Sequence, residues 1–227
     1  MPFQRLRVTY RNTSCSERPG ASLGRVWADS FEAAGLALAR PEGSKRARVE
    51  TAPPLPQHAT GEAELVDVLL GAPVDPAEAV RRLTTRLPRG LEALHAEEIG
   101  ERLPSLNAST RAARYRAIFR PDQAPDDLGH RVERLLGLPM LDWEELRGER
   151  LRRFDLRALV YDLALHEEDG CAVLEMRLAL SQEGAGRPAS VVAALGIGAP
   201  DCLVRTAIEV ERPLIAIRAW RERGRFA

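Results

Sequence analysis

The segment 52–70, "APPLPQHATGEAELVDVLL", constrains the fold more than any other part of the chain. Its three prolines, within 53–56, are incompatible with a helix interior and cannot donate hydrogen bonds to a sheet, so the chain must turn here. The apolar run "AELVDVLL" (63–70) that follows is predicted to be a strand, and "RARVETA" (46–52) before it is predicted to be another. Two strands therefore follow one another across the proline turn.

The rest of the first half supplies two more strands and two helices. In "RLRVTYR" (5–11) apolar and polar residues alternate, which predicts a half-buried strand. An amphipathic helix follows from about Ala21 and ends at Gly35, where a glycine suits the last turn. A second helix within 75–88 has strong start signals, and "GLEALHAEEI" (90–99) is the fourth strand. The order β-α-β-β-α-β predicts a ferredoxin-like unit.

The second half repeats this order. Four strands are predicted at 114–120, 154–168, 171–181 and 202–211, and two helices at 125–138 and 186–197. The fold class predicted from the sequence is therefore α+β, with two tandem ferredoxin-like (βαββαβ) units built on antiparallel sheets. We expect the first unit to span residues 1–105 and the second, with a basic C-terminal tail, to span residues 106–227.

Charge and cysteine content limit the classes of function. The 33 basic residues are balanced by 33 acidic ones, which argues against a dedicated nucleic-acid coat. Three widely spaced cysteines form no metal-binding or disulfide pattern, so we expect reduced thiols, no iron–sulfur cluster, no structural zinc and no cofactor. With no signal peptide and no apolar run long enough for a bilayer, a cytoplasmic protein without membrane contact is expected.

The acids of the opening segment are the first candidates for chemistry. Glu62 and Glu64 share one face of the predicted strand, and Asp67 points to the other face. A carboxylate pair can perform acid/base catalysis only with a perturbed pKa. We interpret the three acids as a solvent-facing part of the scaffold, and we assign no catalytic residue.

Arginines in the second half are the better candidates for ligand binding. The loop "EGAGRP" (183–188) opens a predicted helix, where free backbone N–H groups can hold an anion. We predict a ligand site composed of Asp155, Arg157, Arg187 and Arg205. The terminal "RAWRERGRFA" (218–227) interleaves arginines with aromatic residues, a composition that suits single-stranded RNA, although a charged tail without a ligand is the simpler interpretation.

Several short motifs, in this order, resemble a bacterial family described as radical-SAM-linked (or radical-SAM-associated) proteins, a domain of unknown function. The resemblance extends over residues 4–212 and is carried by "LRVTY" (6–10), "AAGLALA" (33–39), "PLP" (54–56), "GEAELVD" (61–67), "FDLRALVYDL" (154–163), "GRPASVVAALGI" (186–197) and "VRTAIEV" (204–210). Members of that family occur alone or attached to a radical-SAM enzyme, so the resemblance implies such an enzyme as a partner.

This chain departs from the family in its first half. The family's Phe-x-Ser-His-Leu-Asp segment is replaced by "RPGASLGRVWADS" (18–30), and its Gly-Phe-Asn-Pro-His-Pro loop by "PEGSKRARVE" (41–50). The glycine that the family has after the proline turn is replaced near His58. The resemblance therefore implies a divergent member that keeps the scaffold but has lost the polar motifs.

Two functional hypotheses follow. The first is a non-catalytic accessory protein that binds RNA or a protein partner in RNA modification or ribosome-related work. The alternative is an enzyme acting on RNA or a small anionic substrate through Asp155, Arg157, Arg187 and Arg205, with an acid as base. Radical chemistry itself would need a clustered set of three cysteines, which this sequence lacks.

Overall fold

The computed structural model describes residues 3–14, 22–40, 47–100, 102–148 and 150–211. The chain forms two compact units. The first contains the described residues up to Pro54, Thr60–Thr110, and Val210 with Glu211, and the second contains Leu55–Ala59 and Arg111–Glu209. Cys15, Ala21, Lys45 and the C-terminal tail with Trp220 and Phe226 lie outside the described residues.

The first unit contains an antiparallel sheet. Its strands are β1 (Gln4–Asn12), β2 (Val49–Thr51), β3 (Ala59–Leu70) and β4 (Leu91–Ile99). They lie in the order β4-β1-β3-β2, and β1 pairs antiparallel with both β3 and β4, as β2 does with β3. The antiparallel pairing of β2 with β3 confirms the reversal that the prolines predict.

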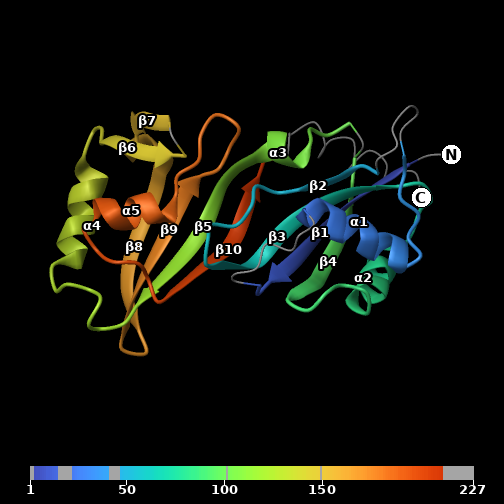
Figure 1. The fold of residues 1–227 in the computed structure, drawn as a ribbon, viewed down its shortest axis with the longest axis horizontal. Helices are drawn as coiled ribbons and strands as arrows, with labels where there is room; N and C mark the ends of the chain where they lie inside the picture. The colour runs from blue at the N-terminus through green and yellow to red at the C-terminus, as the bar shows by residue number, and fades with distance from the viewer. Residues whose placement is uncertain (1–2, 15–21, 41–46, 101, 149, 212–227) are drawn as a thin grey trace, which may run out of the picture. The chain divides into compact units, whose positions relative to one another are not determined.

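Two helices cover one face of this sheet, α1 (Leu23–Ala33) and α2 (Pro76–Thr84) (Figure 1). Their starts and ends follow local chemistry. Asp75 caps α2 by accepting a hydrogen bond from the backbone N–H of Glu78, and Gly35 has a φ of 69° just after α1. The core between helices and strands includes Leu6, Val8, Tyr10, Trp27, Phe31, Val66, Val68 and Leu83.

The face of β1 that points away from the helices is also buried. The alternation of apolar and polar residues along this strand did not predict that. Arg5 and Arg7 point away from the helices, yet only 9% and 7% of their surfaces are exposed. The guanidinium of Arg5 donates to the backbone carbonyls of Leu103 and Pro104, just before the short helix α3 (Leu106–Ser109). The expectation of a half-buried strand was wrong here because another segment of the unit covers its polar face.

Two of the acids of β3 are also more buried than the sequence predicted. Glu62 is exposed, but Glu64 and Asp67 are each only 3% exposed. Glu64 folds back over Gly61, where an added Cβ would lie 2.5 Å from its Cγ atom. The prediction of a solvent-facing acidic surface therefore holds for Glu62 alone, and Gly61 leaves the space that the buried Glu64 side chain occupies.

The turn before β3 contains a residue in the left-handed region. His58 has a φ of 61°, a conformation that side chains with a Cβ adopt at a cost and that glycine adopts freely. The resemblance described above implies a glycine close to this point. A glycine at this position would adopt the observed backbone conformation without that cost.

The second unit has its own antiparallel pairs. Its elements are β5 (Thr110–Phe119), α4 (Leu128–Gly137), β6 (Asp142–Arg147), β7 (Arg150–Asp155), the 3-10 helix η1 (Arg157–Leu159), β8 (Val160–Glu168), β9 (Cys171–Ala179), α5 (Pro188–Ala194) and β10 (Cys202–Val210). The strand order is β10-β5-β9-β8, and β6 and β7 form a separate two-stranded sheet. Helices α4 and α5 contribute to one core with β5, β8 and β9 (Figure 1).

The predicted single strand over 154–168 was wrong. This segment divides into the end of β7, the 3-10 helix η1 and the whole of β8. The Asp155 carboxylate causes the break, because its Oδ1 accepts hydrogen bonds from the backbone N–H groups of Leu141 and Arg157. The β6–β7 hairpin was not predicted either; Gly148, with a φ of 63°, lies in its turn.

The α+β class and the mostly antiparallel pairing are confirmed. Within the described residues, no helix has both the length and the apolar character needed to cross a membrane.

Gly61 provides a test of the buried Glu64. We expect Gly61→Ala to destabilise the protein by about 1–3 kcal/mol, because the new methyl group displaces a packed side chain. Gly24→Ala in α1 is the control, since no atom lies within 4 Å of its added Cβ. That change should be neutral or stabilising by up to about 1 kcal/mol. Urea unfolding measures both, and equal stability of the two variants would contradict the crowding at Gly61.

Candidate functional site

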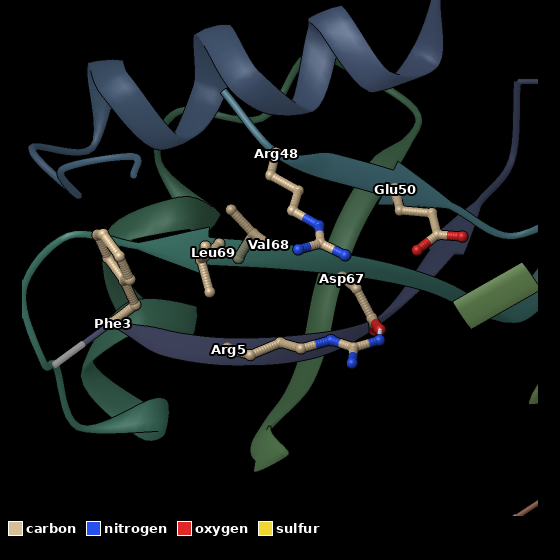
Figure 2. A pocket seen from close by; sticks show the side chains of 7 residues that line it. All are labelled: Phe3, Arg5, Arg48, Glu50, Asp67, Val68 and Leu69. Carbon is tan, nitrogen blue, oxygen red and sulfur yellow. Dashed lines mark hydrogen bonds and ion pairs between the residues drawn. The ribbon is translucent and has the colours of Figure 1, made fainter. Parts of the chain in front are cut away.

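A pocket of about 280 Å³ lies in the first unit, beside the polar face of β1 and β3 (Figure 2). We call it the first-unit pocket. It is lined by Phe3, Arg5, Arg48, Glu50, Asp67, Val68 and Leu69. Two acids and two arginines thus surround a small apolar surface.

Asp67 forms the centre of the charged network beside this pocket. Its Oδ2 accepts from Nη2 of Arg5 at 2.7 Å and from Nη2 of Arg7 at 2.9 Å, and its Oδ1 accepts from Nε of Arg7 at 2.7 Å. The register of β1 and β3 causes this arrangement, because Arg7 is the direct cross-strand partner of Asp67. Both oxygens of this buried carboxylate are therefore occupied by guanidinium donors.

Glu50, on β2, is held in a similar way by α3. Its carboxylate accepts from the backbone N–H groups of Leu106 and Asn107 at 3.1 and 3.0 Å, and from the Asn107 side chain at 2.9 Å. Burial alone would raise the pKa of Glu50. Hydrogen bonds from Asn107, Ser105 and Leu106 outweigh that burial, so the pKa of Glu50 is lowered from its ordinary value of 4.5.

Arg48 is the remaining charged group of the first-unit pocket. Figure 2 shows its side chain extending from the segment just before β2 toward β3. Within the described part of the chain, its guanidinium has no hydrogen bond or ion pair to the protein, in contrast to Arg5.

The second unit presents a charged sheet face on the side away from α4 and α5. We call it the open face and define it by Arg114, Arg116, Tyr161, Asp162, Ala164, Glu175, Arg177 and Thr206. Seven of these residues, all except Tyr161, line a shallow hollow of about 250 Å³ together with Tyr115 and Met176.

One carboxylate organises the open face. Glu209 accepts from Nε of Arg114 at 2.8 Å and from Nη2 of Arg177 at 2.7 Å. These contacts, led by that of Arg177, lower the pKa of Glu209. The Arg177 guanidinium also lies 5.1 Å from the ring centre of Tyr161, which is 48% exposed. The arginines of this face are therefore partly neutralised, and an aromatic ring lies among them.

The four residues predicted from the sequence as a ligand site are placed as follows. Asp155 and Arg157 are brought together by the hydrogen bond at the end of β7. The Arg157 side chain donates to the carbonyls of Leu136 and Val160, at 3.2 and 2.7 Å. Its guanidinium thereby closes the last turn of α4 against the start of β8.

The other two predicted residues have separate surroundings. Arg187 precedes α5 and forms an ion pair with Glu145 of β6. Arg205, on β10, is fully buried. The loop before α5 is tightly packed, because a Cβ at Gly186 would lie 2.7 Å from the carbonyl oxygen of Leu159. A ligand role for these four residues stays a prediction.

In the parts of the chain that the structure describes, no group of three or more His, Cys, Asp or Glu side chains is arranged to hold a metal ion. Within the described residues, neither Cys171 nor Cys202 is part of a disulfide bond.

Sequence reasoning missed Arg5, Arg48 and Glu50, and it assigned Asp67 to the scaffold surface. One signal for part of this set was present: two arginines at alternate positions of one strand and one acid on a nearby strand. The missing information was the register that places Arg7 opposite Asp67, which a hydrophobic pattern does not specify to the residue.

The Asp67 network should be essential to the fold. We expect Asp67→Ala to destabilise the protein by about 3–5 kcal/mol, because it leaves two buried guanidinium groups without their carboxylate. Glu92→Ala is the matched control, since Glu92 pairs with Arg11 of the same strand but both side chains are about half exposed. Its cost should stay below about 1 kcal/mol. Chemical denaturation measures both, and comparable losses would refute the special role of Asp67.

The lowered pKa of Glu50 predicts a pH dependence. Because its pKa is lower in the folded than in the unfolded protein, the carboxylate stabilises the fold above the ordinary value of 4.5, and this contribution disappears as the pH falls through the folded-state pKa. Glu50→Gln should therefore be less stable than wild type at neutral pH, and the difference should shrink below about pH 4.5. Urea midpoints measured at several pH values test this; a difference independent of pH would show that the charge of Glu50 is not involved.

Comparison with solved structures shows only distant likeness. A chain of the "Crystal Structure of a Cbf5-Nop10-Gar1 Complex" aligns with 95% of this chain and 56% of its own length, with a TM-score of 0.45 and 15% identity. This chain thus spans little more than half of that protein. An unknown protein from Galdieria sulphuraria aligns with 93% of this chain and all of its own length, with a TM-score of 0.28 and 12% identity.

A putative glycine cleavage system transcriptional repressor gives a TM-score of 0.26 at 11% identity, over 93% of this chain and all of its own length. No curated protein matches the sequence. Residues 28–188, well over half of the chain, match a family described as "Uncharacterized protein conserved in bacteria (DUF2344)". The chain therefore belongs to this conserved bacterial family.

Proposed function

We propose that this chain is a non-catalytic accessory protein that binds a protein partner through the open face of its second unit. The observation that carries the proposal is the exposed sheet face itself, where charges of both signs surround Tyr161 and Ala164. On this face several charged side chains lie near one another, with an aromatic ring among them. Such a surface is suited to specific docking of a partner protein.

The charge balance of this face favours a protein over RNA. RNA binding draws on an excess of arginine and lysine that neutralises phosphates. On the open face, Arg114 and Arg177 already share the carboxylate of Glu209, and Asp162 and Glu175 add two more negative charges. A partner protein with complementary charges of both signs satisfies such a face better than a polyanion does.

Four acids of the described residues have a lowered pKa, which does not suit the role of a general acid. A general acid needs a pKa raised toward neutrality. Where the acids of the described residues have clearly shifted pKa values, namely at Glu50, Glu78, Asp127 and Glu209, the shift is downward. These groups are therefore held as carboxylates that accept hydrogen bonds.

Two further parts of the proposal concern the fold of the two units and the identity of the partner. The strand orders β4-β1-β3-β2 and β10-β5-β9-β8 support a pair of ferredoxin-like units, the second with the β6–β7 hairpin inserted. The resemblance to radical-SAM-linked proteins supports a radical-SAM enzyme as the partner, in RNA modification or ribosome-related work. Both are parts of the same proposal.

The test is affinity purification of a tagged copy from cells, with proteins and RNA measured in the same eluates. We expect a protein that wild type retains and Ala164→Glu loses, because a bulky charge added among the residues of the open face blocks docking. Ala193→Glu is the matched control, since this alanine is exposed on α5 of the same unit. It should retain the partner, and both variants should melt like wild type.

Direct binding between the purified partner and the three versions of the chain completes the test. Retention of the same protein by Ala164→Glu would contradict docking at this face. Recovery of RNA alone, with a strong dependence on salt, would replace the protein partner by RNA.

A further inference from the structure

We propose that the first-unit pocket is a binding site for a small organic anion, a carboxylate or a phosphate monoester with an apolar or planar body, held by Arg48. This site is independent of the open face and of the proposed partner. It rests on charge, shape and the fixed backbone around the pocket.

The charge of the pocket leaves Arg48 available. Asp67 is saturated by Arg5 and Arg7, and Glu50 is held by the N–H groups at the start of α3. Both carboxylates therefore already accept hydrogen bonds from other groups, and neither forms an ion pair with the Arg48 guanidinium. Among the charged groups that line the pocket, Arg48 is the one whose side chain makes no hydrogen bond or ion pair within the described residues.

The shape of the pocket suits a ligand with two parts. Leu69, which is half-buried on the same face of β3 as Asp67, provides apolar surface beside Arg48, and Phe3, which is 46% exposed, stands at one end (Figure 2). An acidic group can meet the planar fork of Arg48 with two hydrogen bonds while its body covers the apolar residues. The volume of about 280 Å³ is close to the lower limit of small-molecule sites, which limits the ligand to about the size of a mononucleotide.

The backbone that carries Arg48 is fixed in the unbound protein. The carbonyl of Arg48 accepts a hydrogen bond from the N–H of Leu69 at 3.1 Å, and the next residue, Val49, pairs with Val68 in the sheet. An arginine on this base loses less freedom on binding than one on a loop. Arg89 makes a suitable comparison, since it is also exposed in the first unit but lines neither described pocket.

Calorimetric titration of the purified full chain tests the site with two anions and their neutral counterparts. Benzoate and benzamide represent the carboxylate, and adenosine monophosphate and adenosine represent the phosphate monoester. We expect at least one anion to bind saturably at millimolar concentration while its neutral counterpart does not. The stronger anion then identifies which acidic group the site prefers.

Variants assign the binding to Arg48. Arg48→Ala should weaken the binding of that anion by about tenfold or more, the effect of losing a charge-assisted contact. Arg48→Lys should recover only part of the affinity, because lysine keeps the charge but lacks the bidentate fork. Phe3→Ala should weaken binding of the aromatic anions, and Arg89→Ala should leave it unchanged.

Thermal unfolding without ligand separates binding from folding, since exposed Arg48 should be replaceable without a change in melting temperature. The proposal is overturned if neither anion binds, if the neutral compounds bind equally well, or if Arg48→Ala binds like Arg89→Ala. Because the open face is not involved, Ala164→Glu should bind the anion like wild type whether or not it loses a protein partner.

Discussion

The buried carboxylate of Asp67 is the interaction on which the first unit depends. Its two oxygens bind the guanidinium groups of Arg5 and Arg7, and the same Arg5 holds the carbonyls of Leu103 and Pro104. One acid thus joins two strands and the segment that covers them. Without it, the two guanidinium groups would be buried without the carboxylate that they share. The same packing places Arg5 and Asp67 in the wall of the first-unit pocket.

The first-unit pocket and the open face use charge in opposite ways. In the first, charged side chains lie inside, where low exposure makes each pairing strong and leaves Arg48 as an isolated cation at the rim of the pocket. In the second, charged rows lie on an exposed sheet face, where each pair is weaker and can be exchanged for contacts with another molecule. A small anion for the first and a protein surface for the second are the ligands that these environments favour.

Local patterns predicted most elements of the fold, because they depend on residues close in sequence. The cap formed by Asp75 and the strand at 5–11 are examples. Burial of Arg5, Arg7 and Glu64 could not be predicted, since alternation indicates which face a side chain occupies but not what covers that face. Arg157 was expected to bind a ligand, but its observed acceptors are backbone carbonyls, which every sequence has and no sequence pattern marks.

Strand β8 has a consequence for how copies of this protein meet. In the described chain it is the last strand of the order β10-β5-β9-β8, so one row of its backbone groups has no strand beside it. The backbone groups of such an edge strand can form hydrogen bonds with the same edge strand of another copy. β8 carries Asp162, Glu167 and Glu168 within seven residues, all exposed. A second β8 placed alongside would bring like charges together, so the acids of this strand oppose self-association and aggregation while its open face stays accessible.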